Sequence, residues 1–215
     1  MPGLLRWLLF AVVLTGLPVA AGVLVLDEET PATTTPEPPS YSSTPLAGYD
    51  TSVVTLSRAP FCNQVPEEAF TEALPGDVGW TVTAYRNGQA AELAPGLEDV
   101  AHEYGCRVAG AGLVSGEVRA WLFAPPVTRS RAAELIAEAA GRGSCTRPAQ
   151  APAYGSPSVA LICPAGDRRW ASFRGLFGDA WLSCSLAAPA TVDDQALLDR
   201  AGRWCVAVVE AAAVG

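Results

Sequence analysis

The sequence predicts an α+β domain, an antiparallel sheet with helices packed on one face, behind an N-terminal transmembrane helix. Three observations lead to this fold class. Helical patterns are separated by runs of short strand-like segments, a charge-free apolar run lies near the N-terminus, and all the cysteines follow that run. Runs of strands between separate helices are typical of α+β domains, whereas regular strand–helix alternation is typical of parallel sheets.

Residues 1–26 are predicted to form a membrane anchor. No charged residue occurs from Trp7 to Leu26, and a helix of about 20 apolar residues spans a hydrocarbon core about 30 Å thick. Arg6 precedes this run and acidic residues follow it, so the body of a single-pass protein is expected outside the cytoplasm, at the cell membrane. A signal peptide cleaved near Val19–Ala21 is the alternative, and the length of the run favours the uncleaved anchor.

Residues 27–56 are predicted to be a linker. Thr, Ser and Pro make up most of the stretch from Thr30 to Pro45, and such a composition favours an extended chain without a core. We expect a stalk, whose hydroxyls are either O-glycosylated or unmodified. Residues 57–215 then form the folded domain, which is long enough for a core of its own.

The first half of this domain reads as a helix, three strands and a helix. Pro66 fits the first helical position of a helix over 66–74, followed by the acidic Glu67 and Glu68. Residues 79–86 alternate and lead into Asn87-Gly88, a hairpin signal. Further strands are expected over 101–109 and 117–124, and Thr128 is the expected cap of a helix over 129–140.

The second half repeats this order, which suggests an internal repeat. A strand is expected over 158–163, and a hairpin is expected from 169–174 and 180–187. Thr191-Val192-Asp193-Asp194 has the pattern of a capping box that opens a last helix ending near Ala212.

The cysteines are expected to form disulfides. No two of them have the short spacing of zinc ligands or of a redox pair. Many pairings are possible, and we favour sequential pairs because each would tie a helix or its flank to the sheet. The residues concerned are Cys62, Cys106, Cys145, Cys163, Cys184 and Cys205.

The sequence marks no catalytic, cofactor-binding or metal-binding residue. The single histidine, His102, has no marked nucleophile beside it, and helix capping accounts for the Asp193-Asp194 and Glu67-Glu68 pairs. No nucleophile elbow, zinc-protease motif or phosphate loop occurs. A net charge of −8 also argues against nonspecific nucleic-acid binding.

Two clusters have both a structural and a binding interpretation. Arg168-Arg169-Trp170 is either a solvated hairpin or a contact for an anionic envelope polymer. The aromatic side chains of the same hairpin are either core residues or a binding platform. They are Trp170, Phe173, Phe177 and Trp181.

Four short segments resemble those of a known group of proteins: Phe61–Pro66, Tyr104–Val108, Trp181–Ser185 and Arg203–Cys205. The chain is similar to actinobacterial cell-envelope domains of unknown function that are often found in lipoproteins. Those domains are in turn similar to the extracytoplasmic sensor domains of membrane serine/threonine kinases. The resemblance implies a disulfide-bonded α+β sandwich in the envelope, and it supplies no catalytic residue. This chain lacks the lipobox cysteine of the lipoproteins, which favours the transmembrane anchor.

The sequence therefore predicts a noncatalytic extracytoplasmic domain that binds a partner protein or an envelope ligand. Two alternatives stay open. One is a cell-envelope hydrolase that uses carboxylates alone, and the other is a structural subunit of a membrane complex.

Overall fold

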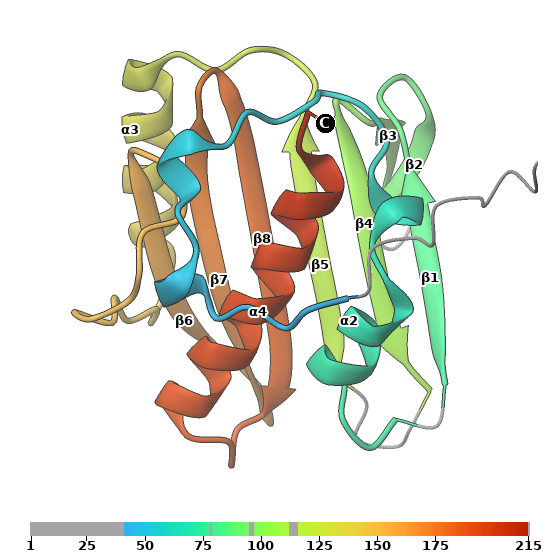
Figure 1. Cartoon of the computed structure of the whole chain (residues 1–215), viewed down its shortest axis with the longest axis vertical. Helices are drawn as coiled ribbons and strands as arrows, with labels where there is room; N and C mark the ends of the chain where they lie inside the picture. Colours follow the sequence, from blue (N-terminus) through green and yellow to red (C-terminus); the bar gives the residue numbers. More distant parts are fainter. Residues whose placement is uncertain (1–40, 78, 95–96, 112–115, 215) are drawn as a thin grey trace, which may run out of the picture. The chain divides into compact units, whose positions relative to one another are not determined.

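The computed structural model describes residues 41–215, except 78, 95–96, 112–115 and 215 (Figure 1). The predicted anchor lies outside this range. Within the described range, the helices are too short or too polar to cross a membrane.

The compact unit begins at Tyr41, earlier than the expected boundary at residue 57. Two short 3₁₀ helices, η1 (Leu46–Gly48) and η2 (Thr51–Val53), precede that boundary. The side chains of Leu46 and Leu56 are 3% and 6% exposed and belong to the core. These apolar residues are isolated in a polar segment, so they form no periodic pattern that the sequence could reveal.

A six-stranded antiparallel sheet forms the centre of the domain, in the order β1-β4-β5-β8-β7-β6 (Figure 1). This confirms the α+β class with an antiparallel sheet. A further hairpin of β2 (Ala90–Ala94) and β3 (Leu97–Val100) was not expected. The main strands are β1 (Trp80–Tyr85), β4 (Glu103–Gly110), β5 (Glu117–Phe123), β6 (Ser158–Ala165), β7 (Arg168–Phe177) and β8 (Ala180–Pro189).

Each half of the domain supplies three consecutive strands of the main sheet, and β5 pairs with β8 where the halves meet. From its outer edge inward, the first half has the order β1, β4, β5 and the second half has the order β6, β7, β8. In both halves the strands of the main sheet thus follow one another in sequence order. The helices do not follow this symmetry, and the internal repeat stays a prediction.

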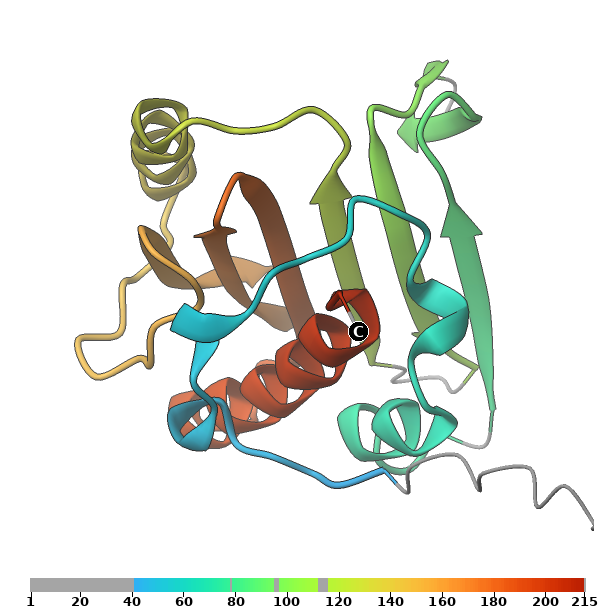
Figure 2. The same ribbon diagram turned by 45° about the horizontal axis from the view of Figure 1, so that its top comes forward.

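The helices cover both faces of the sheet, so the expectation that they pack on one face is only partly correct. They are α2 (Glu67–Ala73), α3 (Arg129–Ala140) and α4 (Asp194–Ala212). Helices α2 and α4 pack together on one face, whereas α3 lies on the other (Figures 1 and 2). Leu182 points into the main core under α4, while its neighbour Trp181 joins α3 in a second cluster. Nearly all of β8 is buried, so its sequence does not show which face a helix covers.

Helix α4 forms the base of the main core. Its Trp204 is almost fully buried against Phe70 of α2, with ring centroids 5.9 Å apart. The indole N–H of Trp204 donates to the backbone oxygen of Arg119 at 3.4 Å. The N-cap of α4 is Asp193, whose carboxylate accepts from the N–H of Ala196 at 3.0 Å. The capping box expected over Thr191–Asp194 is therefore not formed, and Asp194, the first residue of α4, forms an ion pair with Arg169.

The structure contains the three sequential disulfides, which confirms the expected pairing. Cys62–Cys106 ties the 3₁₀ helix η3 (Cys62–Gln64) to β4, Cys145–Cys163 ties the end of α3 to β6, and Cys184–Cys205 ties β8 to α4. The Cα–Cα distances are 5.0, 4.2 and 5.7 Å. Loops of these lengths give each disulfide roughly 3–4 kcal/mol in the chain-entropy model.

The close approach of residues 154 and 175 gives a stability prediction. A Cβ at Gly175 would overlap the backbone oxygen of Tyr154, which cannot move without shifting the main chain. We expect Gly175→Ala to lower the free energy of unfolding by roughly 2–4 kcal/mol in urea titrations. Gly79→Ala is the matched control, because nothing lies within 4 Å of its Cβ position. Equal losses in both variants would contradict this account of Gly175.

Candidate functional site

The structure does not assemble the polar residues that the sequence singled out. His102 is exposed in a bend before β4, and Glu67 and Glu68 lie in the first turn of α2. In the part of the chain that the structure describes, no hydrogen bond or ion pair joins these residues to each other or to Asp193. No group of three or more His, Cys, Asp or Glu residues there has the geometry of a metal site.

The aromatic side chains of the β7–β8 hairpin divide between the two faces of the sheet. Phe173 and Phe177 pack against Tyr154 in the main core, with ring centroids 6.1 and 5.1 Å apart. Trp181 packs under α3. Trp170 is partly exposed, and its register places it on the face opposite α4. Of the four aromatic side chains of this hairpin, only Trp170 is therefore available for a binding surface.

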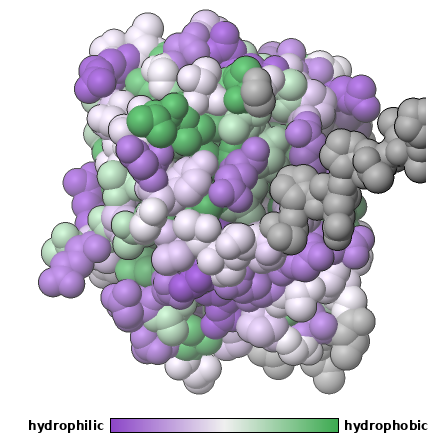
Figure 3. Space-filling view, in the orientation of Figure 1, coloured by the Kyte–Doolittle hydropathy of each residue, from purple (hydrophilic) through white to green (hydrophobic). Residues whose placement is uncertain are grey.

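The α4 side of the molecule offers little apolar surface. Figure 3 shows mostly hydrophilic and neutral side chains there, with small separate apolar areas. Scattered exposed apolar residues are normal on a soluble domain.

The face opposite α4 carries an ordered set of large and small side chains, which we call the arginine–tryptophan face. It combines two arginines and two tryptophans with three small serines at adjacent positions of β5, β8 and β7. Across these strands, Arg119 lies opposite Ser185 and Ser172, and Trp121 lies opposite Ser183 and Arg174. Trp170 precedes Ser172 on the same face. The set is Arg119, Trp121, Trp170, Ser172, Arg174, Ser183 and Ser185.

Arg119 lies between the two tryptophans of this face. Its guanidinium carbon is 4.5 Å from the ring centroid of Trp170 and 5.9 Å from that of Trp121. Both distances are within the range of cation–π attraction. Ser185 and Ala187, on the strand between, have small side chains that are almost fully buried. Long side chains from β5 and β7 therefore cover this part of β8, where no helix does.

Glu117 holds Arg119 in place. Its side chain is only 8% exposed, and one of its oxygens accepts from the Nε atoms of Arg107 and Arg119, each at 2.5 Å. Burial acts to raise the pKa of Glu117, but the hydrogen bonds and charges of the two arginines outweigh it and lower that pKa. Glu117 thus stays ionised, and it leaves the other nitrogens of Arg119 available.

Arg174 is the unusual residue of the face. Its Nε atom is buried and makes no hydrogen bond with the described part of the chain. The Nε of Arg169 is in the same state, but the other nitrogens of Arg169 donate to Asp194 and to the backbone oxygen of Val192. Burial lowers the pKa of Arg174, and the nearby charge of Arg142 lowers it further. Ser183 lies directly opposite Arg174 on β8. None of the hydrogen bonds among the described residues involves the side-chain hydroxyls of Ser172, Ser183 or Ser185, so this region has donors to spare.

Tyr85 extends the face toward the edge of the sheet. Its ring lies over Gly105, where a Cβ would overlap it, and its hydroxyl donates to Glu103 at 2.9 Å. Burial and the negative charge of Glu103 raise the pKa of Tyr85 well above its ordinary value. Tyr85 is therefore a neutral hydrogen-bonding group beside the arginines.

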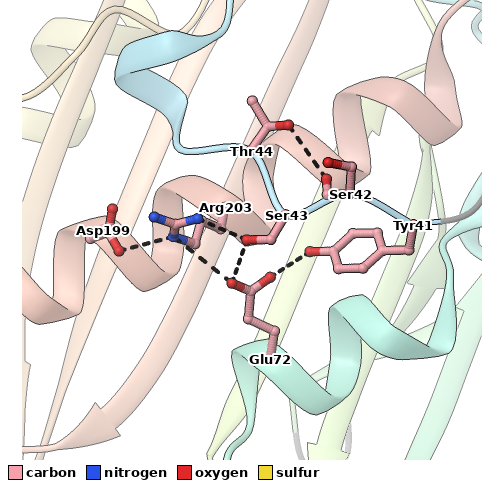
Figure 4. A network of polar contacts seen from close by, with 7 residues as sticks. All are labelled: Tyr41, Ser42, Ser43, Thr44, Glu72, Asp199 and Arg203. Atoms are coloured by element: carbon pink, nitrogen blue, oxygen red, sulfur yellow. Dashed lines mark hydrogen bonds and ion pairs between the residues drawn. The ribbon is translucent and has the colours of Figure 1, made fainter.

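A second polar network, on the α4 side, is a structural latch (Figure 4). Tyr41 and Ser43 each donate to one oxygen of Glu72 at 2.5 Å. Arg203 donates to Ser43 at 2.8 Å and to Asp199 at 3.0 Å, and it lies 3.8 Å from Glu72. Burial and the hydrogen bond to Glu72 raise the pKa of Tyr41 well above its ordinary value. Both acids are thus engaged in fastening the first residues of the domain to α2 and α4.

A carboxylate-based hydrolase would need a pocket that holds two acidic side chains, and two pockets in the described part of the chain bear on this alternative. One, of about 260 Å³, lies between η3 and the end of β1. The other, of about 140 Å³, lies between η1, residues 148–152 and α4, and Asp199 is its single acid. Neither pocket brings together the pair of carboxylates that glycoside hydrolysis requires.

Trp170 was recognisable from the sequence as a candidate binding residue, whereas the other members of the arginine–tryptophan face were not. The signal was present as an alternation: Trp170, Ser172 and Arg174 take every second position of β7. The set is recognisable only when β5 and β7 are known to flank β8, because β5 is far away in the sequence.

Comparison of the chain with protein-family models, with curated proteins and with solved structures finds no match. The resemblance to actinobacterial envelope domains therefore stays a prediction.

The buried Glu117 predicts a specific dependence of stability on pH. Because its pKa is lowered in the folded state, its contribution is present above the pKa of an unfolded glutamate, about 4.3, and is lost as the pH falls through the folded value. We expect Glu117→Gln to lower the free energy of unfolding at pH 7 by roughly 1–3 kcal/mol. The difference from the wild type should shrink in acid.

Urea titrations between pH 7 and pH 3 measure this difference. Glu134→Gln is the matched control, since Glu134 is an exposed helix residue paired with Arg131. A constant gap between Glu117→Gln and wild type at all pH values would show that the lost interaction is not ionic.

Proposed function

We propose that the protein is a noncatalytic, membrane-anchored extracytoplasmic domain that binds an anionic ligand of the cell envelope through the arginine–tryptophan face. The predicted anchor and stalk support the location. The three disulfides also support it, because such bonds persist in oxidising compartments outside the cytoplasm.

The observation that carries the proposal is the buried, unpartnered Nε of Arg174. A buried donor without a partner costs free energy, and the neighbouring positive charge of Arg142 adds to this cost. An apolar residue of similar size would avoid both costs. A carboxylate or phosphate group placed over Ser183 would accept from Arg174 and from the serine hydroxyls.

The composition of the face supports the same conclusion. Tryptophan, tyrosine and arginine are the residue types enriched at binding hot spots. This face presents tryptophan and arginine, and Tyr85 of β1 lies beside it. The chain as a whole carries a net charge of −8, whereas Arg174 and Arg142 lie together without a described acidic partner. Glu117 is already shared by two arginines. An anionic ligand therefore complements this face in charge.

Arg174→Met tests the proposal, because binding and stability should change in opposite directions. We expect the variant to bind polygalacturonate, a carboxylated glycan, at least about tenfold more weakly, as the loss of one charged hydrogen bond predicts. We also expect its free energy of unfolding to rise by about 1 kcal/mol. Calorimetric titration of the full-length protein in detergent measures the affinity, and thermal unfolding measures the stability.

Two controls make the result specific. Arg200→Met removes the same charge from α4, on the opposite side of the sheet, and should change neither the affinity nor the effect of salt on it. Dextran, a neutral glycan, should not bind. Unchanged polygalacturonate binding by Arg174→Met, or no binding by the wild type to this polymer and to polyphosphate, would refute an anionic ligand at this face.

The location has its own test. A phosphatase that is active only outside the cytoplasm, fused after residue 215, should be active, and a β-galactosidase at the same point should be inactive. The reverse pattern would place the domain in the cytoplasm and overturn the proposal. A fusion that replaces the chain from residue 41 onward serves as the control for the anchor alone.

A further inference from the structure

Strand β1 is an edge strand without the usual protection. It lies at one end of the sheet (Figure 1), and its four central residues are exposed. No charged residue, proline or bulge interrupts it. Natural edge strands generally carry such features because a bare edge pairs with other chains. The edge of β1 is thus open to an added strand.

The opposite edge of the sheet is different. The N–H of Thr146 donates to the oxygen of Ile162 in β6 at 2.8 Å, and the N–H of Ile162 donates back at 3.0 Å. The Cys145–Cys163 disulfide fixes this segment beside β6. The chain covers part of one edge of its sheet and, among the described residues, pairs no strand with the outer side of the other.

The hydrogen-bonding pattern shows which groups of β1 face outward. The N–H of Ala111 donates to the oxygen of Gly79 at 2.9 Å, so the backbone groups of Gly79 point toward β4. Because this direction alternates along an antiparallel strand, the groups of Trp80, Val82 and Ala84 point away from β4, toward the open edge.

We propose that two copies of this chain associate through β1, antiparallel and about a two-fold axis at Val82, so that their sheets become one continuous sheet. In this register Val82 lies opposite Val82 of the second copy, and Trp80 lies opposite Ala84 of the second copy. By symmetry the Trp80–Ala84 pair occurs twice, which gives three pairs with the Val82 pair. All of these residues direct their backbone groups outward, so the three pairs exchange about six hydrogen bonds.

The side chains of β1 are complementary to themselves in this register. Val82 is 43% exposed in the single chain, and it would be covered by its symmetry mate. Thr81 would lie opposite Thr83 of the second copy, a favourable cross-strand pair. The large Trp80 would face the small Ala84. A two-fold interface requires this kind of self-complementary surface.

Charge also favours this edge over the rest of the surface. Two copies of a chain with a net charge of −8 repel each other in general, but β1 itself is uncharged. Asp77 precedes the strand and Arg86 follows it. An antiparallel arrangement brings Arg86 of each copy toward Asp77 of the other, whose carboxylate accepts from the N–H of Gly116 at 3.3 Å, so opposite charges and not like charges approach each other at the two ends of the paired strands.

Cysteine cross-linking of the full-length chain in membranes tests both the interface and its register. All six native cysteines are disulfide-bonded, so one added cysteine is the reactive thiol. At an antiparallel hydrogen-bonded pair the Cα atoms lie about 5.5 Å apart, within the range of a disulfide. We expect Val82→Cys to form covalent dimers at least about tenfold faster than Val53→Cys, an exposed valine outside the strand.

Two further variants fix the register. Thr83→Cys alone should not cross-link, because its symmetry mate would lie about 8 Å away, beyond the reach of a disulfide. Coexpressed Thr81→Cys and Thr83→Cys chains should cross-link. Equal rates for Val82→Cys and Val53→Cys, or a product of Val82→Cys with a different protein, would overturn the proposal. Cross-linking by Thr83→Cys alone would overturn this register.

Val82→Lys provides a test without cysteine. It places two like charges at the two-fold axis, and a lysine on a strand edge opposes pairing. We expect the full-length dimer in detergent to become monomeric by light scattering, with an unchanged circular dichroism spectrum. If the wild type and Val82→Lys are both monomeric at the same concentrations, the proposed interface is wrong.

Discussion

The burial of β8 on both faces is the constraint on which this structure depends. On one face Cys184 is bonded to Cys205 of α4, and Leu182 and Leu186 enter the main core. On the other face Trp181 packs under α3, and small residues fill the rest of the strand. A central strand with two buried faces must be covered twice. Here a helix does this fully on one side, whereas α3 covers only part of the other.

The arginine–tryptophan face follows from that incomplete cover. Where α3 ends, side chains from β5 and β7 lie across β8, and they need small neighbours to do so. Arg119 is satisfied in this position, because Glu117 and two tryptophans hold it. Arg174 is not, because its buried Nε makes no hydrogen bond with the described residues. The interactions of Arg119 thus explain its place in the packing of this face. Packing alone does not explain Arg174, because its buried Nε has no hydrogen-bond acceptor among the described residues.

The elements that the sequence predicted correctly depend on local signals. Thr128 caps α3 as expected, since the cap and its partner Arg131 are three residues apart. Two of the sequential disulfides also follow from local order, because Cys145–Cys163 and Cys184–Cys205 each join consecutive parts of the fold. Cys62–Cys106 closes a longer loop that contains α2 and β1. The face covered by α3 is a different matter, since it depends on neighbours that the strand order brings together. The helix begins with Asp193 as its cap and not with Thr191 of the expected capping box, a difference of two residues that sequence patterns do not resolve.

The two halves of the sheet share one strand order and differ in what covers them. In the second half, α3 covers the face of β6 and β7, and Thr146 covers part of the outer edge. In the first half, the corresponding edge, β1, carries four exposed residues and no blocking charge. In the second half, both a face and part of the outer edge of the sheet are therefore covered by the chain itself. It leaves the open edge at β1 and the two arginines of the arginine–tryptophan face, on β5 and β7, as separate places for a second copy and for a ligand. None of the seven residues of the arginine–tryptophan face lies on β1. Occupation of one place therefore does not exclude occupation of the other, and a paired sheet would present two arginine–tryptophan faces to a polymeric anion, which raises avidity without any new contact.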